Sequence, residues 1–374
     1  MKLTSRERMM RIFQNKEIDR PALKLWGYEP NLELTNPAYG PVCEAAQKTD
    51  LVLTVGNNMD IYCGKYVDEL ITREYHETDQ PIWIDHHITF HTPKGDLKGV
   101  MRFSTIGEPA YTMEYMIKEP EDMDKLLSMP YVQVDYDPAP FFEKQALIGD
   151  RGIVMSGLDH AGYALQRITG SENLALFSVD CREKVEEVLS VYSKRLENCA
   201  KTILSAGVKA PFAWVGPELF TPPLLSPKDF DDFVFKYDKP ISDIVHNAGS
   251  HVWVHCHGKV ANFVERFINM GVDVLNPLEP PKNGDIHMKE IVKKYGNRIG
   301  WEGNIEMQDL IQASPEHLRA LIDECVEAGN ESGRFIMCPS SGFMEYPRPS
   351  KEYIENLLIY LNYGYERVEA CRRK

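Results

Sequence analysis

The sequence lacks the features that mark membrane, secreted and nucleic-acid-binding proteins. No window approaches the roughly 18 uninterrupted apolar residues of a membrane span, and the start, Met1-Lys-Leu-Thr-Ser-Arg-Glu-Arg8, has no apolar signal region. The formal net charge is -14 and the basic residues are scattered, which disfavours binding to nucleic acid. The eight cysteines are dispersed without close spacing, which indicates reduced thiols. We therefore expect a cytoplasmic protein with neither a membrane nor a nucleic-acid partner.

Nothing in the sequence divides the chain into separate domains. No Gly-, Ser- or Pro-rich linker, low-complexity segment or convincing repeat interrupts the 374 residues, of which 43% are hydrophobic and 26% charged. No Gly-x-Gly-x-x-Gly follows the first apolar run, which argues against a doubly wound dinucleotide-binding sheet. We predict a single domain over residues 1–374.

Eight short apolar runs alternate with helical segments. Helices are expected over 181–206, 227–248, 260–270, 286–295 and 315–328. This alternation, at this count, predicts an α/β fold of the (β/α)8 TIM-barrel type. A helix over 4–15, begun by Thr4 as its N-cap, is expected to form a helical cap below the barrel. The predicted strands are 22–26, 51–56, 152–157, 210–216, 251–257, 272–276, 298–301 and 334–338.

Residues from about 68 to 105 differ from the rest of the chain. They contain alternating polar and apolar runs with a turn at Pro93-Lys-Gly-Asp96, which predicts an insertion of antiparallel hairpins. His86, His87 and His91 fall in this insertion. Alternation places His86 on the opposite face from the other two, so we interpret the three as hairpin residues rather than as a metal site.

The fifth predicted strand ends in a cluster of metal-binding residue types, His251-Val-Trp-Val-His-Cys-His-Gly258. Side chains alternate along a strand, so His255 and His257 share one face and Cys256 lies on the other. The carboxyl ends of barrel strands meet at the mouth where such folds place their active sites. The pattern therefore predicts two imidazoles side by side at this mouth, although a pair of hydrogen-bonded structural histidines would look the same.

Other strand ends add groups suited to zinc. Glu218 follows the fourth strand and Cys338 ends the eighth, so we predict His255, His257, Cys338 and Glu218 as metal ligands, with Glu218, His255 and His257 as catalytic residues. Glu218 could equally be a loop carboxylate and Cys338 a buried thiol, and Cys256 rather than His257 could be the second ligand of the fifth strand. Contacts to a cofactor or substrate are predicted for Trp26, Tyr28 and Asn304, with Trp214, Phe343 and Tyr346 as further aromatic residues near the mouth.

The chain resembles the uroporphyrinogen decarboxylase superfamily nearly from end to end. The resemblance rests on Ser5-Arg-Glu-Arg8 with Asp19-Arg-Pro21, on His255-Cys-His-Gly258 followed by Gly271-Val-Asp273, on Gly303-Asn-Ile-Glu306, and on Asn362-Tyr-Gly364. It implies a barrel. The true decarboxylases carry an arginine-rich segment after the first strand, and this chain has Leu25-Trp-Gly-Tyr-Glu-Pro30 there, without an arginine to bind a tetrapyrrole carboxylate.

The other branch of the superfamily consists of zinc-dependent methyltransferases that work with a corrinoid protein. They bind zinc through His-x-Cys on the fifth strand and a later cysteine, which the resemblance matches to His255 and Cys338, with His257 replacing the middle cysteine. An imidazole in place of a thiolate leaves zinc more electrophilic.

The resemblance thus implies a zinc enzyme that moves a methyl group between a small O-methyl donor, such as an aromatic methyl ether, and cobalt. Because no Asp-x-His-x-x-Gly stretch is present, the corrinoid is expected on a separate partner protein. Two alternatives remain open. One is a metal-free decarboxylase of a smaller substrate, with Asp or Glu as the acid. The other is a binding or regulatory subunit whose zinc is structural.

Overall fold

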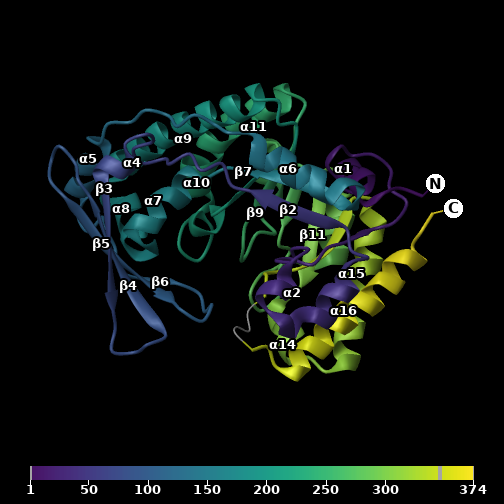
Figure 1. Ribbon diagram of the computed structural model, residues 1–374. Coiled ribbons are helices and arrows are strands. Elements are labelled where there is room, and N and C mark those ends of the chain that lie inside the picture. Colours follow the sequence, from purple (N-terminus) through teal and green to yellow (C-terminus); the bar gives the residue numbers. More distant parts are fainter. Residues whose placement is uncertain (1, 344–347, 374) are drawn as a thin grey trace.

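Eight parallel strands form one curled sheet in the computed structural model, which describes residues 2–343 and 348–373 (Figure 1). Their order, β1-β12-β11-β10-β9-β8-β7-β2, follows the chain around the barrel, and all eight predicted strands are confirmed. The strands are β1 (Ala22–Leu23), β2 (Leu51–Val55), β7 (Gly152–Gly157), β8 (Phe212–Val215), β9 (Val252–His255), β10 (Val274–Asn276), β11 (Gly300–Ile305) and β12 (Phe335–Pro339).

The two ends of this sheet are joined at Asp50, the residue before β2. Its backbone N–H donates to the Leu23 carbonyl at 2.7 Å, and its carboxylate accepts the Leu23 N–H at 2.9 Å. The Asp50 carboxylate thus takes the place of a backbone carbonyl in the hydrogen bonding between β1 and β2. The ring of strands therefore closes next to the two-residue strand β1 through one backbone hydrogen bond and one side chain.

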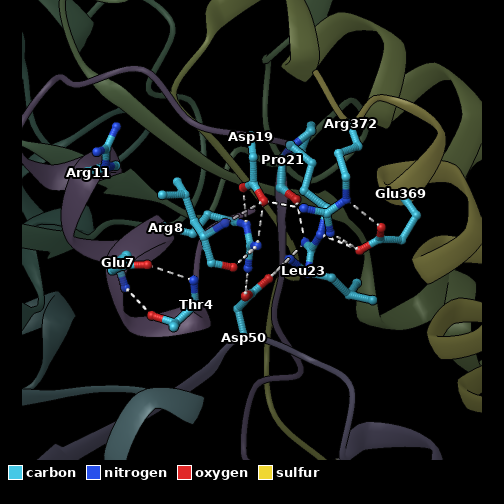
Figure 2. A network of polar contacts seen from close by, with 12 residues as sticks. Thr4, Glu7, Arg8, Arg11, Asp19, Pro21, Leu23, Asp50, Glu369 and Arg372 are labelled. Atoms are coloured by element: carbon cyan, nitrogen blue, oxygen red, sulfur yellow. Dashed lines mark hydrogen bonds and ion pairs between the residues drawn. The ribbon is translucent and has the colours of Figure 1, made fainter. Parts of the chain in front are cut away.

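Buried charges surround this junction (Figure 2). Arg8 donates to Asp19 from Nε at 2.7 Å and to Asp50 from Nη1 at 2.5 Å, while Arg20 pairs with Asp50 at 3.0 Å and with Glu369 at 2.7 Å. Removing one member of such a buried network costs about 3–5 kcal/mol, because a charge is left without its partner. Two of the segments on which the family resemblance rests, Ser5-Arg-Glu-Arg8 and Asp19-Arg-Pro21, therefore stabilise the closure of the barrel.

Helix α1 (Ser5–Phe13) closes the bottom of the barrel, as predicted. Thr4 and Glu7 form a capping box at its start. Its buried Met9, Ile12 and Phe13 pack with inward-pointing strand residues, and each such burial stabilises the fold by roughly 2 kcal/mol. Those strand residues are Ala22, Ile153, Met155, Ala213, Trp253, Val274, Ile336 and Cys338.

Helices cover the outside of the barrel. The predicted helices appear as α9, α12, α13 and α15, while the segment 227–248 consists of α10, the π-helical turn η4 and α11. No helix of the described residues is both long and apolar enough to span a membrane. The remaining bounds are α2 (Leu32–Thr35), η1 (Pro37–Tyr39), α3 (Gly40–Ala46), α4 (Val67–Leu70), α5 (Pro120–Leu127), α6 (Ala139–Ile148), η2 (Gly149–Arg151), α7 (Ala161–Thr169), α8 (Ser171–Asp180), α9 (Arg182–Ser205), η3 (Pro217–Phe220), α10 (Pro227–Phe230), η4 (Asp231–Phe235), α11 (Lys236–Asn247), α12 (Val264–Met270), α13 (Met288–Tyr295), α14 (Met307–Gln312), α15 (Pro315–Ser332) and α16 (Lys351–Ala370).

The predicted insertion forms a separate antiparallel sheet in the order β3-β4-β5-β6, made of β3 (Ile71–Glu77), β4 (Trp83–Phe90), β5 (Leu97–Ser104) and β6 (Tyr111–Glu114). It extends past residue 105 because β6 pairs with β5. Figure 1 shows this sheet beside α7 and α8, on the side of the barrel away from α14 and α16. His86 stacks on Phe103, and His91 lies 3.0 Å from Asp96.

Candidate active site

His255 and His257 lie together at the barrel mouth, as the alternation along the strand predicts. His255 is the last residue of β9, and the two imidazole rings meet edge to face with their centroids 4.4 Å apart. Gly258, which follows them, adopts a φ of +89°. Few other residues reach that left-handed conformation without strain, so the glycine allows the chain to turn away directly after His257.

Cys256 points to the other side of the strand. Its thiol packs in the large core cluster outside the barrel interior, and burial raises its pKa well above the ordinary value. The side chain that shares the mouth with His255 is that of His257.

A chain of hydrogen bonds fixes the proton of His255. Asn276, at the end of β10, donates from Nδ2 to Glu302 Oε1 at 3.2 Å, so its Oδ1 is the acceptor that lies 2.6 Å from His255 Nδ1. His255 therefore carries its proton on Nδ1, and Nε2 has no hydrogen-bond partner among the described residues. Burial, together with the positive charge of His257, lowers the pKa of His255 to about 3. The imidazole is neutral, the form that binds a transition metal.

His257 is held in the same way by a carboxylate. Its Nδ1 lies 2.7 Å from Glu279 Oε1, while Glu279 Oε2 accepts the Gly258 N–H at 2.6 Å. Burial opposes protonation, but Glu279 raises the pKa of His257. A histidine whose Nδ1 donates to a carboxylate presents Nε2 outward, which is the arrangement around most metal-bound histidines.

Beneath the two imidazoles the barrel holds a buried charge pair. Lys24 Nζ lies 2.6 Å from Glu302 Oε1, and Trp253 Nε1 donates to Glu302 Oε2 at 2.8 Å. Burial opposes the charge of Lys24, but Glu302 holds its pKa above the ordinary value. Barrel interiors are usually filled by branched apolar side chains, so this polar layer is unusual, and it anchors Asn276 and through it His255.

Glu218 provides a carboxylate next to this cluster. It lies in η3 after β8, and its Oε2 is buried without a hydrogen-bond partner among the described residues. Burial raises its pKa, and the charges of His257 and His160 oppose that shift. A buried oxygen without a hydrogen-bond partner lowers the stability of the fold unless a ligand or ion binds to it.

The other predicted residues occupy different surroundings. The Trp26 ring packs against His255 with the ring centroids 4.9 Å apart and the ring planes tilted by 52°. Tyr28 is buried and its hydroxyl donates to the Cys43 carbonyl at 3.5 Å. Asn304 donates its backbone N–H to Cys325 Sγ at 3.4 Å. Tyr346 falls outside the described residues.

Cys338 points into the barrel interior, and its electrostatic partners are Lys24 and Glu302. Burial raises its pKa well above the ordinary value.

The donor chemistry at the mouth suits zinc in part. Two imidazoles offer Nε2, each with its Nδ1 engaged by a neighbouring side chain, and the Glu218 carboxylate, one oxygen of which lacks a hydrogen-bond partner among the described residues, interacts electrostatically with His257. Over residues 2–343 and 348–373, however, no three His, Cys, Asp or Glu side chains are already grouped closely enough to hold a metal ion. The predicted ligand set stays a prediction.

Sequence reasoning gave no role to Lys24, Asn276 or Glu302. A lysine inside the apolar run Ala22-Leu-Lys-Leu-Trp26 was the available signal, because a charge in a buried strand requires a partner. Its partner lies 278 residues away in sequence, and only the barrel register brings the two together.

More than half of the chain matches a known protein family. The sequence profile described as Uroporphyrinogen decarboxylase (URO-D) matches residues 150–351, more than half of the chain. The chain belongs to the uroporphyrinogen decarboxylase family. The matched segment contains both histidines, Glu218, Asn276 and Glu302.

Curated relatives of this family member include uroporphyrinogen decarboxylases from Synechococcus sp. (strain CC9605), 26% identical over 149 residues, and from Parasynechococcus marenigrum (strain WH8102), 25% identical over 149 residues. Each match spans 38% of this chain and 38% of the relative's own length.

Among solved structures, a methyltransferase from Methanosarcina mazei is similar with a TM-score of 0.61 and 13% identity, over 97% of this chain and 100% of that one. At this identity the likeness shows the barrel fold alone.

Proposed function

We propose that this family member is a zinc-dependent methyltransferase that moves a methyl group between a small O-methyl donor and the cobalt of a separate corrinoid protein. The observation that carries the proposal is the pair His255 and His257, each with Nδ1 engaged and Nε2 left for a ligand. Glu218, with its unpartnered buried oxygen, is the proposed third ligand. Cys338, which interacts with Lys24 and Glu302, is the fourth proposed ligand and would have to leave those partners.

A zinc ion bound there would act as a Lewis acid on the oxygen of the methyl donor. The remaining roles belong to the chain itself. Asn276 and Glu279 keep both imidazoles in the tautomer that presents Nε2. The indole of Trp26, which packs against His255, would shield that side of the imidazole from water.

The overall reaction balances without an added oxidant. The carbon–oxygen bond of the donor breaks, the methyl carbon bonds to cobalt(I), which supplies the electron pair, and the released oxygen takes a proton. Support for the corrinoid partner and the aryl ether donor comes from the family resemblance and from the Trp26 ring beside His255. Trp214, also predicted near the mouth, instead donates from Nε1 to Asp238 at 3.2 Å in the core outside the barrel interior.

A reduced corrinoid protein mixed with this protein and an aryl methyl ether tests the proposal. We expect the absorbance of cobalt(I) to be replaced by that of methyl-cobalt(III), and His255→Ala to abolish this change. Loss of cobalt(I) absorbance at equal rates with and without the protein would contradict the proposal.

The second candidate is a metal-free decarboxylase acting on a substrate smaller than uroporphyrinogen. Buried carboxyl groups favour it: Glu218 Oε2 and Glu306 Oε1 both lack a hydrogen-bond partner among the described residues, and burial raises the pKa of Glu306. A carboxyl group that keeps its proton can deliver it to a carbanion. This activity would release carbon dioxide without a partner protein.

A further inference from the structure

A cavity of about 990 Å³ lies between the insertion sheet and the carboxyl ends of β2 and β7, and neither His255 nor His257 lines it. Its walls come from the inner face of the insertion sheet, with Ile71 and Ile88, from the ends of β2 and β7, with Asn57 and Asp159, and from α7, with Tyr163. Figure 1 shows the insertion sheet standing beside α7. The volume is at the upper end of the range of about 300–1,000 Å³ for small-molecule sites.

The acidic groups of this cavity already have partners. Asp60 Oδ1 accepts three backbone N–H groups, at 2.9, 2.6 and 3.0 Å. Asp159 pairs with Arg167, and Glu114 pairs with Lys118. These carboxylates are therefore not free to bind a cation.

Arg73 is different, because neither a carboxylate nor a carbonyl pairs with its guanidinium in the part of the chain that the structure describes. It shares the inner face of β3 with buried Ile71 and lies opposite Ile88 of β4. Arg73 is exposed to solvent and lines the cavity next to apolar side chains. Guanidinium binds carboxylate with two parallel hydrogen bonds, so this cation suits a carboxylate whose apolar body lies in the cavity.

Aromatic rings line much of the remaining wall, with Tyr62, Phe90, Tyr115 and Tyr163. Tyr163 also joins the cavity to the mouth. It packs so closely on Gly216 that a Cβ there would come within 2.4 Å of Tyr163 Cβ, and Gly216 precedes Glu218 by two residues. The wall of the cavity is thus continuous with the segment that carries Glu218.

We propose that this cavity binds an aromatic carboxylate, with the ring against the apolar and aromatic walls and the carboxylate on Arg73. The inference deepens the proposed function, because it gives the chemical class of the methyl donor, and it rests on that function only for the ligand's role as donor. Binding itself requires neither zinc nor a corrinoid.

Calorimetric titration with 4-methoxybenzoate and with the uncharged 4-methoxybenzamide tests the proposal. We expect the acid to bind the native protein about tenfold more tightly than the amide, a difference of about 1.4 kcal/mol. Arg73→Gln should abolish this preference. The matched control is Lys98→Gln, which removes an exposed cation from the other face of the same sheet and should leave the preference intact.

The location is tested by Ile88→Trp, which fills the cavity and should weaken both probes by a similar factor. Equal affinity for acid and amide, an unchanged preference in Arg73→Gln, or no binding of either probe at millimolar concentration would overturn the proposal. Methyl transfer from another donor with no binding here would overturn this inference alone. Binding here without any methyl transfer would overturn the proposed reaction and leave the cavity site standing.

Discussion

His255 Nδ1 lies 2.6 Å from Asn276 Oδ1, and Asn276 is in turn fixed by Glu302. Because the amide nitrogen of Asn276 is used as a donor to Glu302, its oxygen must accept, and the proton of His255 has one position. The nitrogen left open is Nε2. A buried network from Lys24 through Glu302 and Asn276 thus sets the ligand-binding form of a histidine at the mouth.

Asn276→Ala tests this positioning role. Without the amide, His255 loses the acceptor for its Nδ1 proton, so we expect zinc affinity to fall about 10–100-fold, as on loss of other groups that orient metal ligands. Zinc affinity is measured by competition with a chromogenic chelator. Asn356→Ala is the matched control, because Asn356 is also buried but donates to the Ala313 carbonyl on the outside of the barrel. Equal zinc affinity in the two variants would show that Asn276 does not position His255.

Lys24→Met tests the buried charge pair. The substitution leaves Glu302 charged inside the barrel, so we expect the free energy of unfolding to fall by about 3–5 kcal/mol. In the double variant Lys24→Met/Glu302→Gln no charge remains, and the single amide oxygen can accept from either Trp253 or Asn276, which donate to different oxygens of Glu302. The double variant should therefore regain at least roughly half of the unfolding free energy that the single variant loses. Denaturant unfolding measures both, and a double variant less stable than the single one would refute the charge-pair account.

The Asp19 carboxyl, part of the buried network at the junction of β1 and β2, should make the stability of the fold depend on pH. Burial raises the pKa of Asp19, but hydrogen bonds from Arg8 and from the Leu3 N–H outweigh it and hold the pKa at about 2, below the ordinary 3.8. A carboxyl with a lowered pKa stabilises the fold above its unfolded pKa and loses that contribution as the pH falls through the folded value. We expect about 2 kcal/mol of unfolding free energy to disappear between about pH 4 and pH 2.

Asp19→Asn should remove this part of the acid sensitivity, while Asp68→Asn, which alters an exposed aspartate, should keep the slope of the native protein. Unfolding free energies from denaturant titrations across this pH range give the slopes. The same slope in native protein and Asp19→Asn would contradict the assignment.

Local patterns in the sequence predict the barrel well. Each strand is a short apolar run, and the alternation of His255 and His257 along β9 correctly places both imidazoles on one side. Thr4 correctly marks the start of the first helix, because capping depends on neighbours in sequence.

What the sequence could not predict depends on register between distant strands. Lys24 meets Glu302, and Asn276 meets His255, only because β1, β10 and β11 are aligned within the barrel. The cavity likewise depends on how the insertion sheet packs beside α7, which no periodicity within the sheet specifies. Its cation, Arg73, is exposed, and nothing in the sequence around it indicates that it lines a cavity.

The central claim is that the two histidines hold zinc, and elemental analysis of untagged protein tests it most directly. We predict about one zinc per chain in the native protein, loss of that zinc in His255→Ala and in His257→Ala, and full retention in His317→Ala, which alters an exposed histidine of α15. Native protein that contains no zinc even when purified in its presence would contradict the account and favour the metal-free decarboxylase.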